Sequence, residues 1–82
     1  MTMNEEFIKG QLEDLLKDLD RIIEDTIRDY TRAGQQFDHA TSIDNLPLKI
    51  LKAGEMQYYS GAEDAYRQAR DFLADIIEKV WS

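Results

Sequence analysis

The chain has 82 residues, no cysteine, a single histidine and a formal net charge of −7. A domain of this length is marginally stable alone, and without cysteine neither disulfides nor thiolate metal sites can support it. Its acidic balance argues against direct binding to nucleic acid or to anionic membranes, because both repel negative charge. We therefore expect self-association, as a homodimer or a higher oligomer, to supply the missing stability.

No segment predicts export or membrane insertion. The first residues, Met-Thr-Met-Asn-Glu-Glu, are acidic, whereas a signal peptide begins with basic residues and continues with apolar ones. No apolar run approaches the roughly 20 residues that cross a bilayer. The expected location is the cytoplasm of a bacterium or of an infected host cell.

The first predicted element is a helix over about 3–33. Thr2 and Glu5 have the spacing of a capping box, and Gly34 after Arg32 and Ala33 is a C-terminal stop signal. Apolar residues at alternating steps of four and three predict a packed seam. This seam is Ile8, Leu12, Leu15, Leu19 and Ile22, with a second row of Leu16, Ile23, Ile27 and Tyr30.

Residues 34–45 are rich in turn formers and predict a loop, which contains His39 and Asp38. A second helix is predicted over about 46–80, capped by Asn45 or Asp44, with Pro47 tolerated in its first turn. Its predicted seam is Leu48, Leu51, Tyr58, Ala62, Ala65, Ala69, Phe72, Ile76 and Val80, interrupted by Glu55. A flanking row is Tyr59, Tyr66, Leu73 and Ile77.

Two glycines leave the continuity of the second helix open. Gly54 could end a helix, and Ser60 with Glu63 could open another as a capping box. The seam keeps its phase across Gly54 and Gly61, which favours one continuous helix, straight or bent there.

The pattern as a whole predicts an all-α fold, a long antiparallel helical hairpin in one domain. Each helix carries two apolar rows, whereas a contact between two helices needs only one narrow seam. Two hairpins packed as a four-helix bundle would cover the second rows.

Four aspartates are spaced so that they share one face of the first helix. Their steps are four, seven and four residues, and they are Asp14, Asp18, Asp25 and Asp29. Such a stripe is either a solvated face or a docking surface for a basic partner, such as a protein that handles nucleic acid. Arg21 and Arg32 interrupt it and weaken its field.

A cluster of aromatic and basic residues suggests an alternative function. Tyrosines stack on bases and arginines pair with phosphates, so a nucleotide could bind at a subunit interface through Tyr58, Tyr59, Tyr66, Arg67 and Arg70. A metal-dependent nucleotide hydrolase would need carboxylates that converge from several helices. Here Glu13, Glu24 and Glu63 have basic residues four positions later, which favours surface ion pairs.

The sequence predicts no catalytic, cofactor-binding or metal-ligating residue, and His39 has no nucleophile marked as its partner. We expect a non-enzymatic protein that acts by binding another macromolecule, as an inhibitor or adaptor. The alternative is a small helical nucleotide-binding protein or hydrolase. In size, charge and helicity the chain is similar to accessory proteins of phages and mobile elements, a likeness of composition that assigns no residues.

Overall fold

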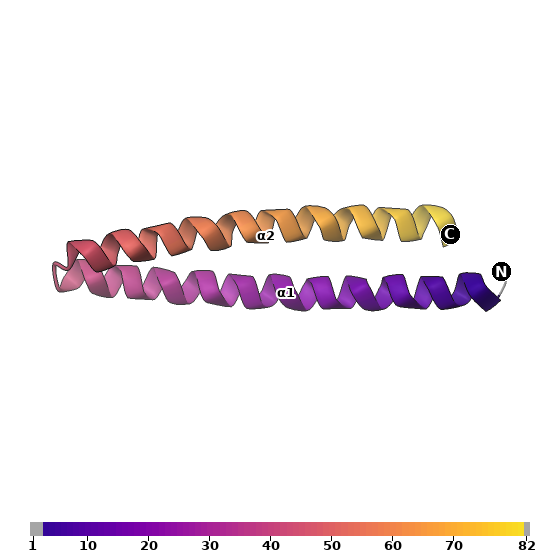
Figure 1. Cartoon of the computed structure of the whole chain (residues 1–82), viewed down its shortest axis with the longest axis horizontal. Helices are drawn as coiled ribbons and strands as arrows, with labels where there is room; N and C mark the ends of the chain where they lie inside the picture. Colours follow the sequence, from indigo (N-terminus) through magenta and orange to yellow (C-terminus); the bar gives the residue numbers. More distant parts are fainter. Residues whose placement is uncertain (1–2, 82) are drawn as a thin grey trace.

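The computed structural model describes residues 3–81, and these form two long antiparallel helices. Helix α1 spans Met3–Ser42 and helix α2 spans Leu46–Trp81. They lie side by side, so that both chain ends are at the end of the hairpin opposite the connection (Figure 1). The molecule measures 62 × 15 × 14 Å. The predicted all-α hairpin is therefore confirmed.

Helix α1 continues through the predicted loop, so the expected end at Ala33 is wrong. Ala33 and Ala40 are 2% and 0% exposed, and Phe37 between them is half-buried. These residues extend the line of contact with α2 at the same four- and three-residue steps. Packing along this line outweighs the cost of Gly34 inside a helix, which is about 1 kcal/mol. His39 consequently lies on the last turns of α1 and is exposed.

The connection between the helices is short and closed by backbone hydrogen bonds. The Asn45 N–H donates to the Ala40 carbonyl at 2.9 Å, and the Asp44 N–H donates to the Thr41 carbonyl at 3.2 Å. These two bonds define a Schellman motif, which requires a left-handed residue after the helix. Asp44 fills that position with a φ of 54°.

Helix α2 begins with a side-chain cap and runs without a break. The Asn45 Oδ1 accepts a hydrogen bond from the Leu48 N–H at 3.1 Å, so Asn45 is the cap. Pro47 lies in the first turn, as predicted. The helix passes through Gly54 and Gly61, which confirms the prediction of continuity. The capping box predicted at the start of the first helix includes Thr2, which lies outside the described residues.

The core between the helices is thin. Only Ile23, Thr26, Ala33 and Ala40 are buried among the described residues, and all four belong to α1. The α2 residues closest to this line are half-buried, and they include charged side chains: Lys52, Met56, Tyr59, Glu63, Arg70, Leu73 and Ile77. One hairpin therefore leaves most of its apolar surface uncovered.

The predicted seam of α2 is wrong in phase. Most of its members point away from α1 and are exposed, namely Leu51, Tyr58, Ala65, Ala69, Phe72 and Val80. The predicted flanking row supplies the contact instead, through Tyr59, Leu73 and Ile77. Three of the four buried α1 side chains are small, Thr26, Ala33 and Ala40, so longer side chains from α2 can fill the space beside them.

Candidate interaction surfaces

Exposed apolar side chains follow one side of the hairpin. On α1 this side contains Ile8, Leu15 and Ile22, which are exposed although predicted as seam residues, while Leu12 and Leu19 of the same seam are half-buried. On α2 it contains apolar residues of the predicted seam, most of which point away from α1. We call this surface the outer apolar face and define it as Ile8, Leu15, Ile22, Leu51, Tyr58, Ala62, Ala65, Ala69, Phe72 and Ile76.

The two rows of the outer apolar face lie on the same side of the hairpin. In α1, Leu15 and Ile22 each precede a residue that packs toward α2. In α2, Tyr58 and Phe72 likewise precede the inward residues of their own helix. One residue is a rotation of about 100°. Because the helices are antiparallel, the same offset turns both rows toward the same side.

The outer apolar face is unusually open for side chains of this kind. Tyr58 is 71% exposed, Phe72 69% and Leu15 48%. The whole chain exposes 6173 Å², whereas a compact monomer of the same mass would expose about 5,100 Å². Exposed large apolar side chains that gather on one side of a protein are typical of a site where another molecule packs.

The side of α2 that faces α1 carries charged side chains, among them Lys52, Glu63 and Arg70. Lys52 pairs with Glu55 at 3.1 Å, and Arg67 pairs with Glu63 at 2.9 Å, within the helix. Arg70 reaches across to Asp20 of α1. Helix α2 thus directs charged residues toward α1 and its larger apolar row outward.

The four aspartates of the predicted stripe follow the outer side of α1. Asp14, Asp18 and Asp25 are exposed, and Asp29 is half-buried. Asp18 pairs with Arg21 at 3.0 Å and Asp25 pairs with Arg28 at 3.1 Å. The stripe therefore has mixed charge at its centre, and it borders the α1 edge of the outer apolar face, since Asp29 continues the row of Leu15 and Ile22.

The residues of the nucleotide-binding alternative are distributed around α2. Tyr58 points outward and Tyr59 toward α1, although their rings meet edge to face at 5.4 Å between centroids. Tyr66 is 37% exposed. Arg67 is held by Glu63, and Arg70 by Asp20 and Asp71. None of these five side chains lines the groove between the helices, and both arginines are engaged in ion pairs.

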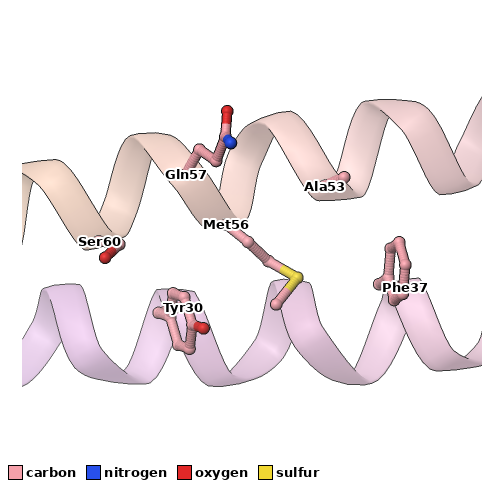
Figure 2. Close-up of a pocket in the computed structure, with 6 residues that line it drawn as sticks. All are labelled: Tyr30, Phe37, Ala53, Met56, Gln57 and Ser60. Carbon is pink, nitrogen blue, oxygen red and sulfur yellow. The ribbon is translucent and has the colours of Figure 1, made fainter.

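A shallow groove of about 350 Å³ lies between the helices near the connection. Figure 2 shows Met56 extending from α2 toward α1 between Tyr30 and Phe37, while the Gln57 amide points away. Ala53 and Ser60 complete the lining. The Lys49 ammonium lies 5.5 Å from the centre of the Phe37 ring, a cation–π contact that holds the end of the hairpin together. No charged group lines this groove, and sequence reasoning did not identify it.

In the described part of the chain, His39 and the acidic side chains form no cluster that would suit catalysis or metal binding. His39 is exposed, and its carbonyl accepts a hydrogen bond from the Ser42 hydroxyl at 2.7 Å. Residues 3–81 contain no group of three or more histidine, aspartate or glutamate side chains placed to hold a metal ion. Neither described helix has an apolar stretch of the length needed to span a bilayer.

Comparison with protein-family models, with curated proteins and with solved structures finds no match for this chain. The outer apolar face and the aspartate stripe are therefore interpreted from their own chemistry.

Proposed function

We propose that this chain is a non-enzymatic helical protein that acts by binding other macromolecules, as an inhibitor or adaptor. The observation that supports this best is the outer apolar face, a long surface of exposed large side chains on a hairpin with few buried residues. Helix packing against another helical surface would bury those side chains, and each buried Leu, Ile or Phe contributes about 1.5–3 kcal/mol. The proposed place of action is the cytoplasm of a bacterium or of an infected cell, and the proposed origin is a phage or mobile element.

The aspartate stripe is the second part of the proposal. A basic partner, such as a protein that normally holds nucleic acid, would be attracted to it over several ångströms. Asp14 is exposed and Asp29 half-buried, and neither has an ion-pair partner among the described residues, so these two carboxylates supply most of the unbalanced charge. Association through such a surface would be fast at low salt and slower at high salt.

The test is affinity capture from an extract of the cell of origin with three immobilised variants beside the wild type. Tyr58→Glu alters the outer apolar face, Asp18→Lys with Asp29→Lys alters the stripe, and Gln35→Glu adds a charge on an exposed position of neither surface. We expect the wild type and Gln35→Glu to recover the same protein, and one of the surface variants to lose it. Recovery of no protein, or equal recovery by all four, contradicts the proposed function.

A further inference from the structure

We propose that a second copy of this chain covers the outer apolar face, with the two α2 helices antiparallel and a two-fold axis passing beside Ala65. This inference rests on the proposed function and names the partner of its apolar surface. The aspartate stripe then stays at the edge of the assembly, where a different partner can reach it.

The low charge of the outer row of α2 is compatible with a second copy at this surface. Two molecules of net charge −7 repel each other, and this repulsion is smallest where the facing surfaces carry little charge. The residues of α2 that form the outer row and its α1-side border, from Leu51 to Phe72, include one charged residue, Glu55, whose carboxylate is paired with Lys52. Asp64, Arg67 and Asp71 are also exposed in this range, but they lie outside that row. The positions bordering that row on its far side are also uncharged: Gly54, Gly61 and Gln68. A basic partner would match acidic residues, and the α2 part of this face offers it none.

The outer row of α2 is also complementary to itself. Tyr58 and Phe72 lie seven residues on either side of Ala65. An interface between identical subunits needs residue i to meet residue j while j meets i. An axis beside Ala65 satisfies this, because Tyr58 of each copy meets Phe72 of the other.

Small residues at the centre of the row permit a close approach. Ala62, Ala65 and Ala69 have no side chain beyond the β-carbon, and Ala65 and Ala69 are exposed. With the axis beside Ala65, this alanine meets its own copy, and Ala69 lies opposite Gly61 of the other chain. The two backbones can then approach until the larger residues on either side, Tyr58 and Phe72, come into contact.

The same axis gives the α1 row a partner. Asp20 of α1 pairs with Arg70 of α2. Because the helices are antiparallel, the α1 turn about nine residues before Asp20 lies level with Lys79, about nine residues after Arg70. That turn is the one between Ile8 and Leu15. The axis places Lys79 of one copy opposite Leu51 of the other. Leu51, which is 57% exposed in the single hairpin, would therefore enter the gap between Ile8 and Leu15 of the second copy, as a knob enters a hole.

The exposed area of the outer apolar face is of the size that a stable dimer needs. Tyr58 and Phe72 are 71% and 69% exposed, and aromatic side chains of this kind bury about 150–250 Å² each. The aliphatic side chains are less exposed and add less each, so one copy offers on the order of 800 Å² with its alanines included. A standard protein interface buries about 800 Å² per partner. The excess surface of the hairpin over a compact monomer has the same magnitude.

The first test measures mass by light scattering after gel filtration at micromolar concentration. We expect the wild type and Gln35→Glu to have twice the 9.6 kDa mass of the chain. Ala65→Glu places two carboxylates at the axis and should reduce the mass to that of one chain. A wild type of one chain mass overturns the proposal, and so does an Ala65→Glu variant that remains a dimer.

The second test remains informative if Ala65→Glu does not fold. The chain lacks cysteine, so a single introduced thiol reports only its own neighbours. Mild oxidation should link Ala65→Cys into a disulfide dimer much faster than Gln35→Cys, because a residue beside the axis lies near its own copy. Equal rates for the two variants overturn the proposed axis. A monomeric wild type that still captures a protein through Tyr58 would overturn the second copy and leave the proposed function standing.

Discussion

Asp20 of α1 and Arg70 of α2 form the ion pair that joins the two helices across their inward faces. Both side chains remain partly exposed, at 47% and 42%. Pairs with this exposure contribute about 0–1 kcal/mol, because water screens their attraction. The pair therefore marks which residues of the two helices lie level with each other and contributes little to the stability of the fold.

Removal of this pair should have a small effect. We expect Asp20→Ala to lower the free energy of unfolding by less than about 1 kcal/mol, and high salt to reduce the difference. Urea unfolding at low and high salt measures both quantities, with Asp14→Ala as the control on an exposed, unpaired position. A loss above about 2 kcal/mol would show that the pair is far more shielded from water than its exposure indicates.

Ala33 should tolerate no enlargement. It is buried at the centre of the helix contact, so Ala33→Leu forces the helices apart and should cost about 1–3 kcal/mol. Thr31→Leu makes a similar change at an exposed position of the same helix and should stay within about 0.5 kcal/mol. Thermal melting followed by circular dichroism compares the two. Equal effects would contradict the observed orientation of α1.

The connection offers a stabilising substitution. Asp44 has a positive φ of 54°, a conformation that glycine adopts without steric cost. We expect Asp44→Gly to raise the free energy of unfolding by up to about 1 kcal/mol. Asp44→Val, which is branched at the β-carbon, should lower it. If both substitutions act in the same direction, Asp44 does not have the backbone conformation described.

The neighbouring cap can be tested separately. Asn45→Ala removes the acceptor of the Leu48 N–H and should cost about 1 kcal/mol. Asn45→Asp keeps an acceptor at the same place and should retain the stability. The cap would be unimportant if the alanine and aspartate variants melted together.

The double change Asp18→Lys with Asp29→Lys should alter stability by no more than about 0.5 kcal/mol. It removes the pair of Asp18 with Arg21 at 3.0 Å, and it also relieves repulsion at four-residue spacing. Once a partner is in hand, the same variant should associate more slowly and with less dependence on salt. Unchanged association rates would identify the stripe as a solvated face.

Much of the fold follows from periodicity and caps. The antiparallel hairpin, the cap at Asn45 and the continuous α2 were all predictable, because each depends on local spacing or on a single side-chain hydrogen bond. The end of α1 could not be predicted in this way. Gly34 is a stop signal in isolation, and only contacts of Ala33 and Ala40 with a distant segment override it.

The phase of α2 could not be predicted for a related reason. Both faces of α2 have heptad spacing, and the sequence pattern predicts that the more apolar face packs against α1. The structure turns that face outward, so Ala65 and Ala69 are exposed instead of packed between the helices. Which face meets α1 depends on how the side chains of both helices fit together in three dimensions, and the spacing within α2 does not contain that information.

The central claim is that association completes the core of this hairpin, and the dependence of the melting temperature on protein concentration tests it most directly. A protein that is stabilised by binding its own copy melts at a higher temperature when it is more concentrated. We predict a rise of several degrees over a hundredfold increase in concentration, with no such rise for Ala65→Glu. A wild-type melting temperature that stays constant over this range would contradict the account.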